Sequence, residues 1–140
     1  MKRFLSKKWT SLVLVSLGLL TLSCDPAQSI LIKNATSSNA TVTFIFSPGE
    51  HMYKFKEDPF SDTLVVELAN TPENSFWQID FGIGTWEVQG SLDSLVAALE
   101  SIRIQSLNFN ETFDEKQDIR NYLEDKLVGR FKETIEIKLE

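Results

Sequence analysis

The sequence is poor in the side chains from which many enzyme centres are built. It holds one histidine, His51, next to the turn residues 47–50, where we expect a solvated side chain. Nucleophilic catalysis by serine needs a neighbouring base, most often histidine, and no G-x-S-x-G elbow presents a serine to one. An H-E-x-x-H zinc motif is also absent. We therefore expect no metal site and no cofactor, and the composition leans away from an enzyme.

The sequence also lacks an excess of basic side chains. Against 14 Lys and Arg it carries 20 Asp and Glu, a formal net charge of −6. Nucleic-acid phosphates require a basic face on the protein, and polybasic membrane attachment requires a cluster of Lys and Arg. We therefore expect no nucleic acid as a partner and no membrane binding through a polybasic segment.

The first 24 residues carry the strongest signal in the chain. Residues 1–8 contain four basic side chains and no acidic one, and residues 12–22 are mostly apolar. The run ends at the small residue Ser23 and at Cys24, the only cysteine of the protein. This order of a basic region, an apolar region and a small-residue cleavage site is typical of a secretory signal. The apolar run is too short for a membrane-spanning helix, which needs about 20 apolar residues.

The segment Thr21-Leu22-Ser23-Cys24 resembles the lipobox of bacterial lipoproteins. The resemblance covers residues 1–24 and implies that residues 1–23 are a signal peptide and that Cys24 becomes the lipid-bearing N-terminus. It also implies a bacterial cell-envelope location with a lipid anchor in a membrane, either outer or inner. An uncleaved anchor and an ordinary cleaved signal are the alternatives. With Cys24 acylated, no thiol remains for a disulfide, redox chemistry or a thiolate metal site.

Signal removal makes the remaining chain more acidic. The four basic residues of the signal are lost from 14 while all 20 acids stay, so the formal charge becomes −10. We expect residues 24–28 to be the lipidated cysteine with a short tether. Residues 29–140 then have the length of one domain.

Apolar and polar residues alternate with period two through most of residues 29–90, which predicts β-strands. The expected strands cover residues 30–33, 41–46, 52–56, 64–68, 77–81 and 86–88, and later 102–105 and 135–139. Two stretches have helical spacing instead. One follows the capping residue Ser91, and the other runs from the capping residue Asp114 to Gly129. The pattern predicts an α+β domain with a mainly antiparallel, sandwich-like β-sheet of about seven to eight strands and two helices in the C-terminal half.

The same alternation predicts which side chains are buried. The expected core comprises Val42, Phe44, Phe46, Leu64, Val66, Leu68, Trp77, Ile79, Phe81, Trp86, Ile119, Leu123, Ile135 and Ile137.

Two carboxylates deserve comparison with a glycosidase centre, which needs a pair about 5 to 10 Å apart. Asp80 and Glu87 lie on either side of the break at Gly82 and Gly84 and could approach each other if their strands form a hairpin. Because alternation assigns both side chains to a solvated face, a catalytic role is the less favoured interpretation.

The aromatic residues near this break suggest a different possibility. Trp77, Phe81 and Trp86 could line an apolar pocket for a small ligand. The favoured interpretation is a tight turn that carries a buried Trp86, since a G-x-G without a third glycine and a following helix is no phosphate cradle.

Residues 108–114 alternate oxygen-bearing side chains but lack the glycine and terminal glutamate of a calcium loop. A loop leading into the second helix is the favoured interpretation. Asn34, Asn39 and Asn110 begin N-x-T sequons, which the turn preference of Asn and Thr explains.

Three functions remain open. The favoured one is a lipid-anchored, non-catalytic binding or structural module whose partner is another envelope protein or a glycan. The alternatives are a small-ligand carrier and a carboxylate-dependent glycan hydrolase.

Overall fold

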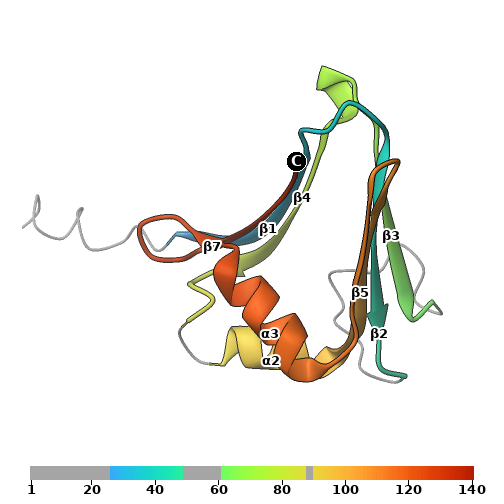
Figure 1. The fold of residues 1–140 in the computed structure, drawn as a ribbon. Helices are drawn as coiled ribbons and strands as arrows, with labels where there is room; N and C mark the ends of the chain where they lie inside the picture. The colour runs from blue at the N-terminus through green and yellow to red at the C-terminus, as the bar shows by residue number, and fades with distance from the viewer. Residues whose placement is uncertain (1–25, 49–60, 88–89) are drawn as a thin grey trace, which may run out of the picture.

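The structure is a computed structural model that describes residues 26–48, 61–87 and 90–140. Within these residues, eight strands form two four-stranded sheets that face each other, with two helices between them at one end (Figure 1). The first sheet has the order β4 (Phe76–Ile83), β1 (Ala27–Asn34), β8 (Thr134–Leu139), β7 (Leu127–Val128). The second has the order β3 (Thr63–Leu68), β2 (Ala40–Phe46), β5 (Leu99–Ser106), β6 (Phe109–Phe113).

All strand pairs are antiparallel except β1 with β8, which are parallel. The helices are α2 (Ser91–Ala98) and α3 (Lys116–Asp125), and a short 3₁₀ helix, η1 (Pro72–Asn74), follows β3. The expected α+β fold with a mainly antiparallel, sandwich-like sheet is therefore confirmed. None of the helices in the described ranges has the length and apolar character to span a membrane.

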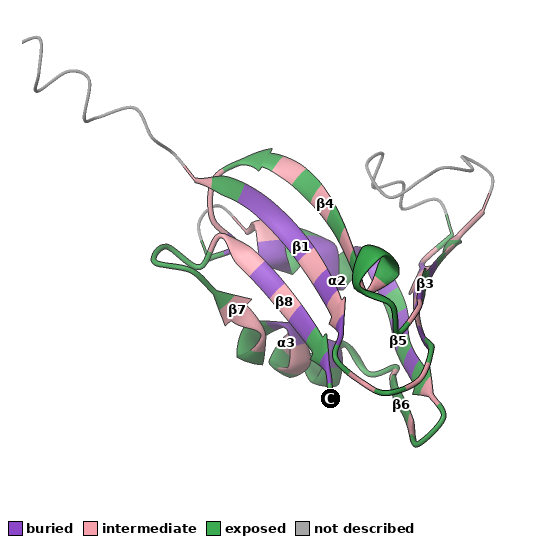
Figure 2. Cartoon of the chain, turned by 90° about the horizontal axis from the view of Figure 1, so that it is seen from above, coloured by how far each residue is buried: buried purple, intermediate pink, exposed green. Residues whose placement is uncertain are grey.

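The core lies between the two sheets because each strand buries alternate side chains. In the first sheet Ile30 lies between Ile79 and Ile135, so one row of aliphatic side chains crosses three strands. Figure 2 shows the resulting alternation along β1 and β8. In the second sheet Val42 and Phe44 of β2 are fully buried against their neighbours.

The two sheets are joined at one end by a buried asparagine. Asn34 ends β1, and its Nδ2 donates to the carbonyl oxygens of Ser38, Leu68 and Ala69, at 2.8, 3.3 and 3.3 Å. Its Oδ1 accepts hydrogen bonds from the backbone N and Oγ1 of Thr36. One side chain of the first sheet thus holds the turn to β2 and the end of β3.

The helices fill the space between the sheets at the other end. Helix α2 buries Leu92, Leu95 and Val96, and α3 buries Ile119 and Leu123. These are the apolar stripes that helical spacing predicts.

Several expected boundaries are wrong. Residues 109–113, expected as a loop, form strand β6, because they pair with β5 as a hairpin. The second helix ends at Asp125 instead of continuing to the residue before Gly129, since Leu127 and Val128 pair with β8 as β7. Glu115 and Gly90 take the N-cap positions expected for Asp114 and Ser91. Strand β5 begins at Leu99, before the start expected at residue 102. Trp86 and Glu87 lie in bends and not in a strand.

Two further differences concern the tether and the core. Strand β1 begins at Ala27, so Ala27 and Gln28 belong to the sheet and not to the tether. Of the expected core, ten residues are buried, whereas Leu64, Trp77, Ile79 and Phe81 are partly buried because they lie on the edge strands β3 and β4. The strand expected at residues 52–56 lies outside the described residues.

Candidate functional site

A hollow of about 500 Å³ opens on the surface beside α2 and α3. Trp86, Leu92 and Leu127 contribute its apolar part. Its charged residues come from four separate segments and are Glu87, Asp93, Arg120, Glu124 and Lys132. We call this site the charged hollow.

Arg120 is the central charged residue of the hollow. Its Nη2 bonds to Oδ1 of Asp93 on α2, and its Nη1 lies 3.2 Å from Oε1 of Glu124, one turn further along α3. The pKa of Arg120 is raised, first by its hydrogen bond to Asp93 and then by its hydrogen bond to Glu124. The guanidinium therefore stays charged and links the two helices on the rim of the hollow.

A third ion pair lies in another part of the wall of the hollow. Lys132, in the loop between β7 and β8, pairs through Nζ with Oε1 of Glu87. The backbone N of Trp86 donates to the carbonyl oxygen of Lys132 at 3.1 Å. The segment after β4 and the loop before β8 are therefore held together by a side-chain contact and a backbone contact.

Trp86 fixes this wall to the first sheet. It is buried, and its indole Nε1 donates to the carbonyl oxygen of Ser29 at 3.0 Å. The Phe81 ring meets its ring edge-on, with centroids 5.1 Å apart. The expected burial of Trp86 is confirmed, and its indole N–H has the partner that burial requires, but the segment around it consists of bends and not of a tight turn.

The three aromatic residues proposed to line an apolar pocket have different roles. Trp77 and Phe81 pack against the core from β4. Neither the charged hollow nor a second hollow beside β2 and β3 is lined by Trp77 or Phe81, and only Trp86 reaches the charged hollow. The structure therefore does not bring the three rings together around either hollow.

The two carboxylates proposed for catalysis do not lie on paired strands. Asp80 is exposed on the outer side of β4, where its Oδ1 accepts a hydrogen bond from Gln78 Nε2 at 2.9 Å. Glu87 lies beyond the end of β4 and binds Lys132. Strand β4 pairs with β1, so the hairpin that would bring Asp80 and Glu87 together is absent from the described residues.

No group of three or more His, Cys, Asp or Glu side chains within the described ranges is placed to hold a metal ion. In β6, successive side chains point to opposite faces, so the oxygen-bearing side chains of residues 109–113 do not converge. Asn34, the first sequon asparagine, is buried with its amide nitrogen bonded to three carbonyls, so it is not presented to a modifying enzyme. Cys24 and His51 lie outside the described residues.

Most residues of the charged hollow were missed at the sequence level. The spacing of Arg120 and Glu124 on one helix face was the available signal, because residues four apart are neighbours on a helix. Asp93 and Lys132 gave no signal, since their partners are 27 and 45 residues away.

Comparison with protein-family models, with curated proteins and with solved structures gave no significant match. The fold and the charged hollow therefore carry the functional argument.

Proposed function

We propose that this protein is a lipid-anchored protein of the bacterial cell envelope that acts by binding, with the charged hollow as its contact site. The observation that carries the binding site is the convergence of Arg120, Lys132 and three carboxylates beside the buried Trp86. The anchor rests on the lipobox resemblance of residues 1–24, with Cys24 as the lipidated residue.

The hollow has the volume expected for a ligand site, which is about 300–1,000 Å³. Its charged groups come from α2, α3, the segment after β4 and the loop before β8, so they are positioned by the fold. A rim with both charges suits a polar partner that carries amines and carboxylates, such as a segment of another envelope protein or a peptide-bearing glycan.

The environment of the acids supports binding over general acid–base catalysis. A catalytic acid of this type needs a carboxyl group in an apolar, desolvated site. Asp93, Glu124 and Glu87 are each about half exposed or more, and each is held by a cation.

The anchor is tested by replacing its lipid-bearing residue. Wild-type protein should partition with membranes and carry acyl mass on Cys24, and Cys24→Ser should be uncleaved or released. Acyl chains supply the anchoring energy, about 0.8 kcal/mol per buried CH₂. Mass spectrometry of the mature N-terminus with detergent partitioning makes the measurement. A wild-type protein without acyl mass would contradict the anchor.

The contact site is tested by photo-crosslinking in intact cells. A photoreactive residue at position 93, on the rim of the charged hollow, should give a discrete adduct with an envelope protein or a glycan. The same residue at position 138, on the far side of the first sheet, is the control. Equal adduct yields at positions 93 and 138, or no adduct at position 93, would contradict the charged hollow as the contact site.

A glycan-hydrolase activity is tested separately with a substrate panel. We expect no turnover from the wild-type protein. Turnover that disappears in the double variant Asp80→Asn, Glu87→Gln would overturn the binding proposal.

A further inference from the structure

The start of β1 is flanked on both sides by exposed apolar side chains. On one side Ala27 pairs with Ile83 of β4, whose side chain is 74% exposed. On the other side lies the loop between β7 and β8, which carries Phe131 with 52% of its surface exposed. Val128, the last residue of β7, is also exposed.

Backbone hydrogen bonds hold these segments around β1. Gly84 N donates to the carbonyl oxygen of Pro26 at 2.9 Å, and Ser29 N donates to the carbonyl oxygen of Glu133 at 2.9 Å. Figure 1 shows the start of β1 and the β7–β8 loop on the same side of the molecule. Ile83, Val128, Arg130 and Phe131 thus form one end of the domain, which we call the β1 end.

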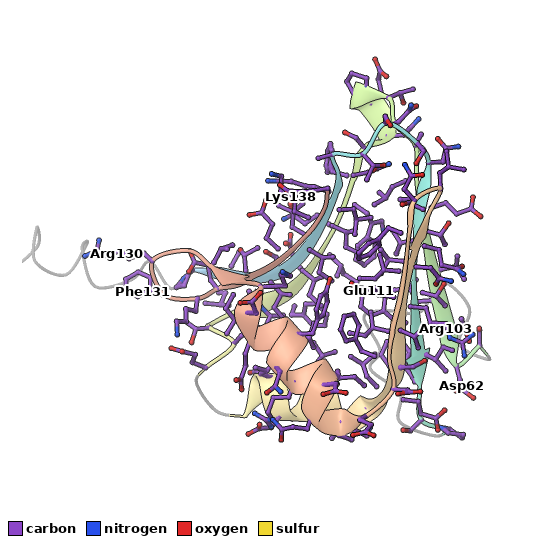
Figure 3. All side chains as sticks on the ribbon, viewed as in Figure 1. Asp62, Arg103, Glu111, Arg130, Phe131 and Lys138 are labelled. Atoms are coloured by element: carbon purple, nitrogen blue, oxygen red, sulfur yellow. The ribbon has the colours of Figure 1, made fainter. Side chains whose placement is uncertain are left out.

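The loop that carries Phe131 has a defined shape. Gly129 has φ +96°, and a Cβ added there would collide with the carboxylate of Glu133. That carboxylate accepts a hydrogen bond from the backbone N of Phe131 at 2.9 Å, so the Glu133 side chain stabilises the loop to which it belongs. Figure 3 shows Arg130 and Phe131 at the outer tip of the loop.

The length of the tether decides what this end can meet. Only Asp25 and Pro26 separate Cys24 from Ala27, the first residue of β1. Since a chain spans at most about 3.3–3.6 Å per residue, Ala27 lies within about 11 Å of Cys24 in any conformation. The headgroup region on each side of a bilayer is about 5–8 Å thick. A lipid on Cys24 therefore places the β1 end against the headgroups.

The chemistry of the β1 end suits that position. Phenylalanine and aliphatic side chains bury well at the boundary between headgroups and acyl chains, and arginine binds phosphate. The Arg130 guanidinium lies over the Phe131 ring, 5.4 Å from its centroid, and none of the ion pairs among the described residues uses it. In a mature chain with formal charge −10, a free cation at this end favours contact with anionic lipid.

We propose that the β1 end rests on the bilayer, with Ile83 and Phe131 inserted at the headgroup boundary and Arg130 on lipid phosphates. The contact rests on the proposed lipid anchor at Cys24. It fixes the orientation of the domain, which the lipid by itself leaves free to rotate.

Site-directed fluorescence on the mature lipoprotein tests the contact. The protein is reconstituted in vesicles of phosphatidylethanolamine with a minority of phosphatidylglycerol. With Cys24 acylated, Phe131→Cys supplies one thiol for an environment-sensitive dye. Leu107→Cys is the matched control, because Leu107 is 81% exposed in the turn between β5 and β6, on the opposite side of the molecule in Figures 1 and 2.

We expect a blue-shifted emission at position 131 that lipid-borne quenchers reduce several-fold more strongly than the emission at position 107. Ile83→Cys should behave like Phe131→Cys. Water-like emission at positions 83 and 131 from acylated, vesicle-bound protein would overturn the contact and leave the anchor intact. A missing acyl group on Cys24 would overturn both. Dye burial in cells but not in vesicles that contain the lipoprotein as their sole protein would assign the β1 end to a protein partner and overturn the lipid contact.

Discussion

Three side chains have an unusual share in satisfying backbone groups of this protein. Asn34 binds carbonyls of the connection to β2 and of the end of β3. Trp86 binds the carbonyl of Ser29, and Lys116 binds carbonyls at the end of α2. Buried or terminal backbone groups that lose their partners destabilise a fold. Each of these residues therefore matters through a polar contact that burial patterns do not reveal.

A buried and an exposed phenylalanine test which side chains belong to the core. Phe44 is 1% exposed between the sheets, whereas Phe76 is 58% exposed at the start of β4. Phe44→Ala should lower the free energy of unfolding by about 3–5 kcal/mol, because it removes buried area and leaves a cavity. Phe76→Ala should change it by about 0.5 kcal/mol. Denaturant unfolding of both variants gives the two free energies of unfolding. Equal losses would refute the assignment of Phe44 to the buried face of its strand.

Tyr122 makes the stability of the protein fall at alkaline pH. Its pKa is raised, first by burial and then by the negative charges of Glu111 and Asp125, and its ring stacks on Phe113. The unfolded phenol ionises near about pH 10. The raised pKa therefore contributes stability that is present below about pH 10 and is lost as the pH rises towards the folded pKa.

Tyr122→Phe should remove this alkaline loss while keeping the ring stack. Its free energy of unfolding should fall less than that of the wild type between about pH 8 and about pH 11. Urea unfolding at the two pH values provides the measurement. Identical pH dependence in the two proteins would contradict the assignment.

At the scale of elements, α2 and β5 follow each other without a loop. Helix α2 ends at Ala98 and β5 begins at Leu99, so no C-terminal turn residues cap the helix. Lys116, at the start of α3, fills this role. Its Nζ donates to the carbonyl oxygens of Val96 at 3.1 Å and Ala97 at 2.7 Å, and also to that of Leu99. A cation at a helix C-terminus also complements the helix dipole.

Lys116→Met should lower the free energy of unfolding by about 1 kcal/mol, since it leaves these carbonyls to water while keeping the aliphatic stem. Lys138→Met is the control, because Lys138 bonds to the side chain of Glu140 on the exposed face of β8. Thermal unfolding of the two variants gives the comparison. A loss in Lys138→Met as large as in Lys116→Met would argue against the cap.

At the scale of the whole molecule, the two sheets meet at Asn34 and are separated by the helices at the other end (Figure 1). The Asn34 amide joins β1 of the first sheet to the end of β3 in the second. Since both sheets share one core, we expect them to unfold in a single transition.

Asn34→Ala should lower the free energy of unfolding by about 2–3 kcal/mol, because it leaves buried carbonyls unpaired. Asn70→Ala is the matched control, since the Asn70 amide makes one exposed bond, to the Ser37 carbonyl at 2.9 Å. Circular dichroism and tryptophan fluorescence should give one common midpoint in the wild type. Equal losses in both variants would refute the role of Asn34, and separate midpoints would refute the single transition.

The period of the apolar pattern determined much of the fold. Alternation placed Val42 and Phe44 in the core and predicted strands β1 to β5 and β8, because burial of one sheet face imposes a period of two on the sequence. Helical spacing likewise predicted the buried stripes of α2 and α3. These features depend on residues close together in the sequence, so each can be predicted from one short segment.

Only the tertiary structure decided the features that depend on distant partners. The short strand β7 exists because Leu127 and Val128 pair with β8, although their sequence continues a helical pattern. Lys132 meets Glu87 across 45 residues. Ile83 pairs with Ala27 of β1, and the loop that carries Phe131 is bonded to β1 through the carbonyl oxygen of Glu133. The sequence by itself determined that Cys24 carries the lipobox resemblance. The sheet topology decided which exposed side chains lie around the start of β1, because strand pairing is a long-range interaction.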